Sequence, residues 1–427
     1  MKLTKYKLGD LVEVTRGASL SGQFYAEEGE LIRLTLGNFN MNGGGFKENT
    51  SKTDLYFTDP VKDEFILNKG DIITPLTEQS LGLLGTTARV PESGKYIQSQ
   101  DVALVRCKEG LLDPNFCYYL ISSSIVRQQL SAGAQQTKIR HTSPDKIKDC
   151  TVWIPEFEEQ KKIGRILSDI DEKIILNRQI NDNLEAMAKQ LYDYWFVQFD
   201  FPNEEGKPYK SSGGAMVWNE KLKREIPQRW TAAKIKDVAQ TYSGGTPTST
   251  NSEYYDGGNI PWINSGELNN PIITSTTNYI TEEGLNNSSA KLYPQDTVLV
   301  ALYGATAGKV SLLSFEACSN QAVCGVIPHN KIMTTYIRYY LSSLYEHFIT
   351  LSSGSARDNL SQDTIKNTIL PIPQEKILKE YSDAVTPIMS KIIANQKEME
   401  NLTKQRDDLL PLLMNGQAMV NYHLSAC

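Results

Sequence analysis

The chain has 427 residues, of which 40% are apolar and 22% charged, and its formal net charge is -6. This length exceeds what one hydrophobic core usually serves, so two or three domains are expected, and the composition excludes a largely disordered chain. The net negative charge argues against nucleic-acid binding by the surface as a whole. A local basic face is nevertheless predicted between Arg127 and Lys148, where five basic residues stand against one acid.

The six cysteines include no CxxC pair, which favours reduced thiols over disulfides or a metal site. The start, MKLTKYKLGDLVEVTRG, lacks the apolar segment of a signal peptide. No apolar run reaches the roughly 18 residues of a membrane span. A cytoplasmic protein that binds neither metal nor membrane is therefore expected.

Residues 1–155 are predicted to form an α+β domain. Short β-branched stretches such as DIITPL and KYIQSQDVALVRC are separated by Gly, Asn and Ser turns, and one helical segment lies near NFCYYLISSSIVRQQL.

Residues 156–198 follow as a long helix with heptad spacing, which favours a coiled coil over a plain amphipathic helix. The predicted seam contains Ile163, Ile170, Asn177, Leu184 and Leu191. Between them, the other seam positions are expected at Ile166, Lys173, Ile180, Met187 and Tyr194. A buried Asn177 would fix helix register, and a solvent-facing Asn177 is the alternative.

Residues 199–228 are rich in Gly, Pro, Ser and charge, so they are interpreted as a connector rather than a core element. A second α+β domain is expected over 229–373, a second helix over 374–415, and a tail over 416–427. The second predicted seam contains Leu378, Val385, Ile392, Asn395, Met399, Leu402 and Leu409.

The two halves repeat each other. LSAGAQQTKI begins at residue 130 and LSSGSARDNL at residue 351, an offset of 221 that also pairs Gln100 with Gln321 and Tyr118-Tyr119-Leu120 with Tyr339-Tyr340-Leu341. IRLTLGNF pairs with PWINSGEL, and LLGTTARV with LYGATAGKV. A tandem duplication of a unit of roughly two hundred residues is therefore predicted.

No catalytic motif is found. YGATAGKVS, at 303–311, has one residue too few between its glycines for a phosphate loop, and Val310 stands where Ser or Thr is needed. The four histidines show no recognisable spacing to a nucleophile.

WFVQFDFP followed by GKPYKSSGG, the closing LLPLLMNGQ, and the order domain, helix, domain, helix resemble the specificity subunit of type I restriction-modification enzymes. The second copy departs from the family pattern in PIPQEKILKEY, where the first has PEFEEQKKI. The resemblance implies a non-catalytic chain with two target recognition domains, each reading half of a bipartite asymmetric site in double-stranded DNA. It also implies an antiparallel coiled coil that docks two methylation subunits, with restriction subunits in the full complex. No cofactor is expected in this chain; S-adenosylmethionine, ATP and magnesium are expected on partner subunits.

Two groups of residues are predicted to contact DNA because amides, hydroxyls and cations suit base edges and phosphates. One group lies in the loops after Gly133 and Gly354: Gln135, Gln136, Thr137, Lys138, Arg140, Arg357 and Asn359. The other flanks glycines that pair across the repeat: Thr35, Asn38, Thr87, Arg89, Asn264, Ser265, Glu267, Thr306 and Lys309. The alternative is that these residues serve ordinary surface loops and turns.

The first helix, from Ile163 to about Phe196, has a predicted length of about 50 Å. Half-sites one turn of B-DNA apart, with an unread gap of about 5 to 8 base pairs, match that length. Flexible connectors that set the gap are the alternative.

A different class of function, a duplicated coiled-coil scaffold or adaptor for protein ligands, also remains open; DNA binding would be distinguished by its steep salt dependence. The bases read cannot be deduced from the sequence.

Overall fold

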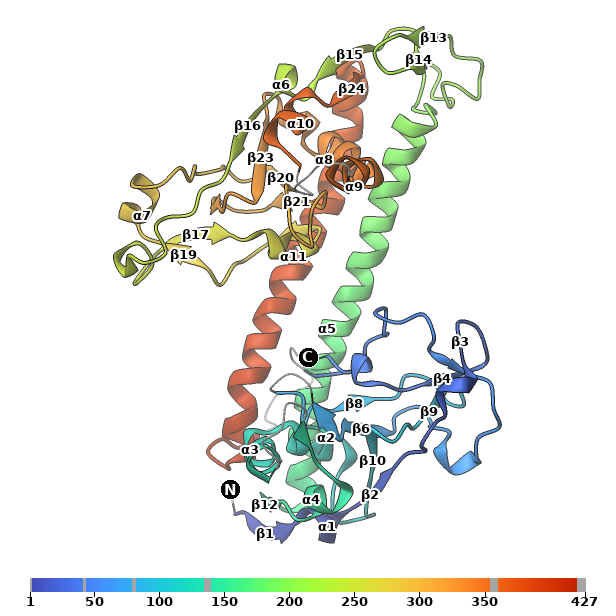
Figure 1. The fold of residues 1–427 in the computed structure, drawn as a ribbon, viewed down its shortest axis with the longest axis vertical. Helices are drawn as coiled ribbons and strands as arrows, with labels where there is room; N and C mark the ends of the chain where they lie inside the picture. Colours follow the sequence, from blue (N-terminus) through green and yellow to red (C-terminus); the bar gives the residue numbers. More distant parts are fainter. Residues whose placement is uncertain (1, 41–43, 79–81, 134–139, 354–359, 421–427) are drawn as a thin grey trace, which may run out of the picture. The chain divides into compact units, whose positions relative to one another are not determined.

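The computed structural model describes residues 2–40, 44–78, 82–133, 140–353 and 360–420 (Figure 1). The chain divides into two compact units. The first contains residues 1–176 and 399–427, and the second contains residues 177–398. Each unit therefore combines one α+β domain with parts of two long helices.

The first unit is built on two four-stranded sheets. One has the order β2-β10-β6-β8, with bounds Val12–Arg16, Val102–Cys107, Ile72–Pro75 and Ala88–Arg89. The other has the order β3-β5-β4-β9, with bounds Tyr25–Ala26, Tyr56–Phe57, Leu31–Arg33 and Tyr96–Ile97. Strand β10 pairs with both β2 and β6, and its first four residues, VALV, are buried. Its continuous apolar sequence is thus explained by its central position.

Helices close the first unit. Helix α2 (Pro114–Ser122) begins with the side chain of Asp113 accepting from the N–H of Phe116 at 2.9 Å. It is followed by α3 (Ser124–Gly133) and α4 (Pro144–Lys148). Strand β12 (Thr151–Ile154) then pairs antiparallel with β1 (Thr4–Lys7).

The second unit repeats this order, with one five-stranded and one three-stranded sheet. A five-stranded sheet has the order β16-β23-β20-β21-β18, with bounds Ala239–Ser243, Val323–Pro328, Val298–Ala301, Val310–Leu313 and Ile272–Ile273. A three-stranded sheet has the order β19-β17-β22, with bounds Tyr279–Ile280, Ile260–Ile263 and Cys318–Ser319. Helices α8 (Thr334–Ser343), α9 (Tyr345–Ser353) and α10 (Gln362–Asn367) correspond to α2, α3 and α4. The ribbon of β15 (Thr231–Lys234) and β24 (Ile369–Ile372) corresponds to β1 and β12, which confirms the predicted tandem duplication.

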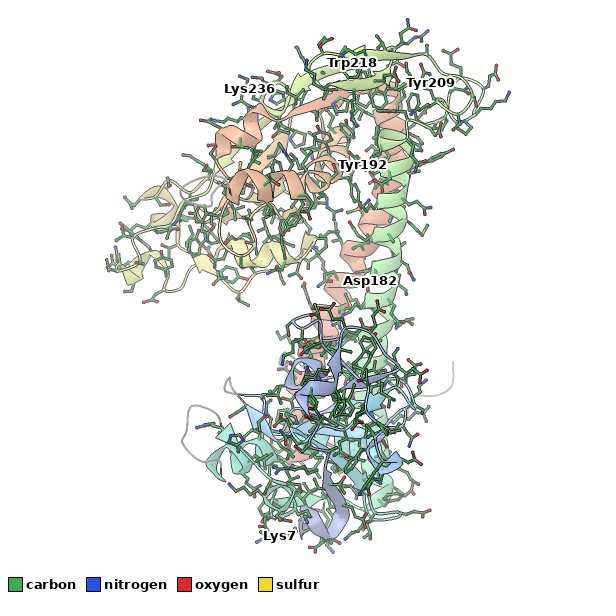
Figure 2. The ribbon with its side chains drawn as sticks, turned by 45° about the vertical axis from the view of Figure 1, so that its right-hand side comes forward. Lys7, Asp182, Tyr192, Tyr209, Trp218 and Lys236 are labelled. Atoms are coloured by element: carbon green, nitrogen blue, oxygen red, sulfur yellow. The ribbon has the colours of Figure 1, made fainter. Side chains whose placement is uncertain are left out.

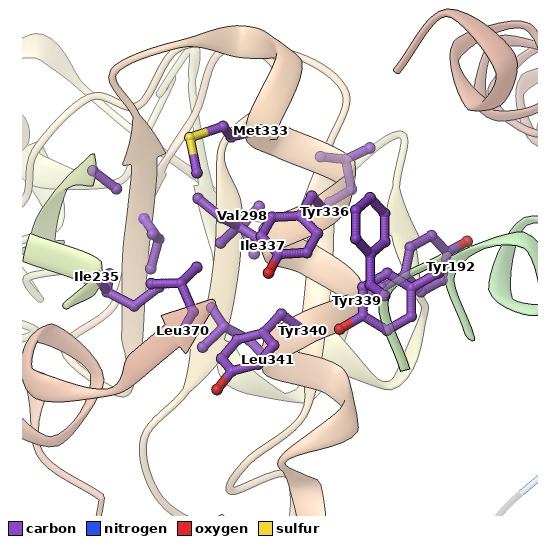
Figure 3. Packing of buried hydrophobic residues seen from close by; sticks show 14 of the residues in the cluster. Tyr192, Ile235, Val298, Met333, Tyr336, Ile337, Tyr339, Tyr340, Leu341 and Leu370 are labelled. Carbon is purple, nitrogen blue, oxygen red and sulfur yellow. The ribbon is translucent and has the colours of Figure 1, made fainter. Parts of the chain in front are cut away.

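Aromatic side chains dominate the core of the second unit. Tyr336, Tyr339 and Tyr340 project from α8, and Tyr192 from the first long helix packs against this group (Figure 3). The Tyr192 and Tyr339 ring centroids are 5.6 Å apart. Burial raises the pKa of all four tyrosine hydroxyls, so they are neutral in the folded protein.

The segment interpreted as a connector belongs partly to this core, so that interpretation was incomplete. Phe199 and Phe201 of this segment are 4% exposed and lie, together with Trp230 of the second domain, in the same cluster as the α8 tyrosines. Phe201 stacks on Tyr209 at 4.7 Å and on Trp230 at 5.3 Å. The hairpin of β13 (Met216–Asn219) and β14 (Arg224–Pro227) lies between these aromatic residues in the sequence, and Figure 2 labels Tyr209 and the exposed Trp218 there.

The two long helices are α5 (Phe157–Tyr192, 36 residues) and α11 (Glu375–Met414, 40 residues). They lie side by side in Figure 1. Asp171 contacts Arg406 in the first unit, and Asn181 contacts Asn395 in the second. Residue numbers rise along α5 as they fall along α11, which confirms an antiparallel pair.

Burial agrees with the predicted seam positions in α11 and with one of the two sets of predicted positions in α5. In α11, residues at both sets of predicted positions are buried or half-buried. In α5, Ile163 and Asn177 are buried, whereas Met187, at one of the intervening positions, is 55% exposed and Lys173 and Tyr194 are also exposed. The other half of the α5 seam lies one residue later, and its buried members are Leu167, Ile174, Asn181, Ala188 and Trp195.

Candidate nucleic-acid interface

Four of the predicted DNA-contact residues form equivalent turns in the two units. The N–H of Thr35 donates to Asn38 Oδ1 at 2.9 Å, and the N–H of Asn264 donates to Glu267 Oε1 at 2.9 Å. Asn38 is 2% exposed and also donates to the carbonyl of Lys47. The geometry thus gives Asn38 and Glu267 the same structural role, which agrees with the alternative that polar residues here serve the turn. Ser265, inside the second of these turns, is half-buried.

The next matching pair of turns begins at Gly85 and Gly304, whose φ values are 79° and 82°. Both glycines occupy left-handed backbone that side chains disfavour, which supports their equivalence. In the first unit, buried Thr87 donates its hydroxyl to the carbonyl of Tyr118 at 3.1 Å. Thr306 in the second unit is 5% exposed. Neither threonine presents an open surface to a ligand in this conformation.

Two cations near these turns are partly accessible and already have polar partners. Arg89 donates to Asn115 Oδ1 at 2.8 Å and lies over the ring of Tyr118. Lys309 donates to Asn269 Oδ1. Both side chains are half-buried, so their charges remain near the surface.

Arg127, Arg140 and Lys146 of the basic stretch lie in or near α3 and already have polar partners. Arg127 donates to the carbonyl of Gly82, and Lys146 donates to the carbonyl of Gly133 at 2.7 Å. Arg140 donates to Ser131 Oγ at 3.0 Å. Among the predicted residues of this group, Gln135, Gln136, Thr137, Lys138, Arg357 and Asn359 lie outside the described residues.

Glu78 is a site residue that the sequence analysis missed. It lies in β7 (Thr77–Glu78), which pairs antiparallel with β11 (Arg140–His141), so Glu78 is directly opposite Arg140. Its carboxylate lies 3.5 Å from Nη1 of Arg140. The two residues are 62 positions apart in the chain. No local motif links them, so no sequence pattern indicated the pair.

The helix pair has polar side chains between its two helices and exposed apolar side chains on its surface. Between the helices of the second unit, Asn177 Nδ2 donates to Glu398 Oε2 at 2.9 Å, and Asn395 Nδ2 donates to Asn181 Oδ1 at 2.9 Å. On its outer surface in that unit, α5 and the helical turn after it expose Met187, Tyr194 and Val197. In the first unit, α5 exposes Ile175 and Leu176, each more than half accessible.

Within the described part of the chain, no group of three or more His, Cys, Asp or Glu residues is arranged to hold a metal ion. Nor does any described helix have the length and apolar character needed to cross a membrane.

Comparison with known proteins identifies relatives over most of the chain. A family model described as the type I restriction modification DNA specificity domain matches residues 2–186 and 227–404. The chain is similar to the specificity subunit of the type I restriction enzyme HindI of Haemophilus influenzae, with 26% identity over 377 residues, 75% of this chain and 81% of that protein. It is also similar to the MjaIX specificity subunit of Methanocaldococcus jannaschii, with 27% identity over 318 residues, 73% of this chain and 71% of that protein.

Among solved structures, the S subunit of a type I restriction-modification system from M. genitalium has a similar fold. Its TM-score is 0.61, with 18% sequence identity and coverage of 97% of this chain and 96% of that one.

Proposed function

The chain belongs to the family of type I restriction-modification DNA specificity subunits, and from this premise we propose that its two α+β domains read the two halves of a split, asymmetric site in double-stranded DNA. Specificity subunits of this family are non-catalytic, and the enzymatic activities reside in partner subunits. The domains proposed to read DNA are residues 1–155 and 229–373, and each is followed by a helix, 156–198 and 374–415 respectively.

One observation carries this proposal: the two units share equivalent helices and an equivalent two-stranded ribbon, yet differ in polar side chains at matching positions. Thr35 and Asn38 in the first unit correspond to Asn264 and Glu267 in the second, with the same backbone geometry. Two related domains with different surfaces are what two half-sites of different sequence require. The loops after Gly133 and Gly354, together with Arg89, Arg140 and Lys309, supply the amides and cations proposed to meet DNA.

The helix pair is proposed to dock two methylation subunits. A group of apolar residues on a helix surface is typical of a protein interface, and α5 exposes Met187 while the helical turn after it exposes Tyr194 and Val197. The buried amides of Asn177, Asn181 and Asn395 favour one register of the pair and so keep that surface constant. S-adenosylmethionine, ATP and magnesium are assigned to the methylation and restriction partners.

Methylation-sensitive genome sequencing tests the proposal. A host that supplies methylation subunits should show a methylated bipartite motif only when this chain is expressed, with an unread gap of about 5 to 8 base pairs. In vitro, DNA binding by the assembled complex should weaken steeply as salt rises, because phosphate contacts release counterions. A genome with unchanged methylation, together with salt-insensitive binding, would favour a protein adaptor instead.

A further inference from the structure

Two exposed glutamines occupy equivalent β-turns, one in each unit. Gln100 lies in a turn closed by the N–H of Val102, which donates to the carbonyl of Ser99 at 3.0 Å. Gln321 lies in a turn closed by the N–H of Val323, which donates to the carbonyl of Asn320 at 3.1 Å. Each turn leads directly into a central strand, β10 or β23, so each glutamine is the second residue of the same structural feature.

Both turns are held against a glycine segment. A Cβ atom at Gly17 would lie 2.1 Å from the carbonyl oxygen of Gln98, and one at Gly244 would lie 2.1 Å from that of Asn320. These approaches leave no room for any side chain. The adjoining N–H groups of Ala18 and Gly245 donate to Gln98 and Ser319 at 2.9 and 2.8 Å. The backbone beneath each glutamine is therefore held by a close glycine approach and by one backbone hydrogen bond.

The neighbours of the two glutamines differ. Thr246 donates its hydroxyl to Oε1 of Gln321, and the half-buried Tyr303 lies at the start of the nearby glycine turn. In the first unit, the positions of Thr246 and Tyr303 are taken by Ser19 and Leu84. Within the described residues, no side-chain hydrogen bond of Gln100 is recorded. The repeat thus keeps an exposed amide on a rigid turn and changes its surroundings.

We propose that Gln100 and Gln321 each contact a base edge, Gln100 in the half-site of the first domain and Gln321 in that of the second. This inference rests on the proposed function. A glutamine amide pairs bidentately with the N6 and N7 atoms of adenine in the major groove, so adenine is the base expected at both positions. The amide oxygen Oε1 of Gln321 can accept two hydrogen bonds. The hydroxyl of Thr246 donates one of them, which orients the Gln321 side chain, and the second acceptor position stays available for DNA.

The experiment compares four forms of the full chain, each expressed with methylation subunits: the wild type, Gln100→Ala, Gln321→Ala and Gln228→Ala. Gln228 is an exposed glutamine next to β14 and serves as the matched control. Methylated motifs are read by sequencing, and binding is measured to duplexes in which each adenine of either half-site is replaced in turn. Each recognition variant should lose at least about fivefold in preference for one adenine in one half-site.

The two variants should affect opposite half-sites, and each should retain wild-type preference in the other half, which also shows that the variant is folded. Gln228→Ala should match the wild type. A split motif that neither Gln100→Ala nor Gln321→Ala alters would overturn this inference and leave the proposed function standing. A wild-type chain that directs no split motif would overturn the proposed function and this inference with it.

Discussion

The carboxylate of Glu78 joins Arg140 to the backbone of a separate loop in the first unit. Its Oε1 atom lies 3.5 Å from Nη1 of Arg140, and its Oε2 atom accepts the N–H groups of Gly82, Leu83 and Leu84 at 3.1, 2.9 and 3.0 Å. The Glu78 side chain is 3% exposed, whereas that of Arg140 is 25% exposed. One buried side chain therefore connects Arg140, inside the basic stretch, to the backbone of residues 82–84.

Removal of this carboxylate should destabilise the first unit. Glu78→Ala leaves buried N–H groups without an acceptor, so we expect a loss of about 3 kcal/mol in the free energy of unfolding. Glu78→Gln retains an oxygen for the N–H groups and loses only the charge, so about 1 kcal/mol is expected. Urea denaturation measures both. Glu92→Ala, which removes an exposed pair with Lys95, is the control and should cost at most about 0.5 kcal/mol. Equal stability of all three variants would contradict the assigned role.

The hydrogen bond between the side chains of Asn181 and Asn395 in the second unit is also expected to stabilise the protein. Asn395→Ala leaves the buried Oδ1 of Asn181 without its donor, and a loss of about 1 to 3 kcal/mol is expected. Replacement of both residues by Leu should recover most of that stability, because no buried polar group remains unpaired. Denaturant unfolding of Asn181→Leu, Asn395→Leu and the double Leu variant measures the coupling energy. Effects that simply add would show that the two amides do not act together.

The repeat explains why the fold could be predicted from the sequence. Matches such as Tyr118-Tyr119-Leu120 with Tyr339-Tyr340-Leu341 identify two copies of one domain, and these residues indeed lie in the equivalent helices α2 and α8. The residues of the helix seam were harder to predict. In α5, Ile180, Met187 and Tyr194 form a second apolar series one residue before Asn181, Ala188 and Trp195. Heptad spacing alone does not tell which series faces the partner helix, and the structure buries the later one.

The contacts of the candidate site could not be predicted as well, because they join residues that are far apart in the sequence. Asn38 was predicted from its residue type and its position beside Gly37, but its amide accepts from its own turn. Arg140 was predicted from local charge, whereas its partner Glu78 comes from a distant strand. Residue type therefore indicated polar surface regions, and tertiary hydrogen bonds decide which of those groups are already occupied.

The exposed apolar residues of α5 yield a test of partner docking. Met187 is 55% exposed, so Met187→Glu should change the free energy of unfolding by at most about 0.5 kcal/mol. A charge inside a packed interface is costly, so binding of a methylation subunit should weaken by at least about tenfold. Gln190→Glu introduces the same charge at an exposed position of the same helix and is the control. Calorimetric titration that gives equal affinity for the wild type and Met187→Glu would remove this surface from the interface.

Exchange of one domain should change one half of the recognised sequence. Replacement of residues 229–373 by the corresponding domain of a relative keeps the first domain and both helices. If each domain reads its own half-site, the methylated motif should change on one side only, with the gap and the other side retained. The reciprocal exchange of residues 1–155 is the matched control and should alter the opposite side. A motif that changes on both sides after a single exchange would exclude independent reading by the two domains.

The length of the helix pair should set the unread gap. Helix α5 contains 36 residues, about 54 Å at 1.5 Å per residue. Insertion of seven residues into both helices, after Gln179 in α5 and after Gln396 in α11, adds about 10.5 Å and preserves the heptad seam, whereas four residues would shift it. B-DNA advances about 3.4 Å per base pair, so the gap in the methylated motif should lengthen by about three base pairs with both half-sites unchanged. Insertion into α5 alone is the control, because it misaligns the buried amides and should reduce methylation without defining a new spacing. A gap that remains constant after the double insertion would assign the spacing to flexible connectors instead of the helices.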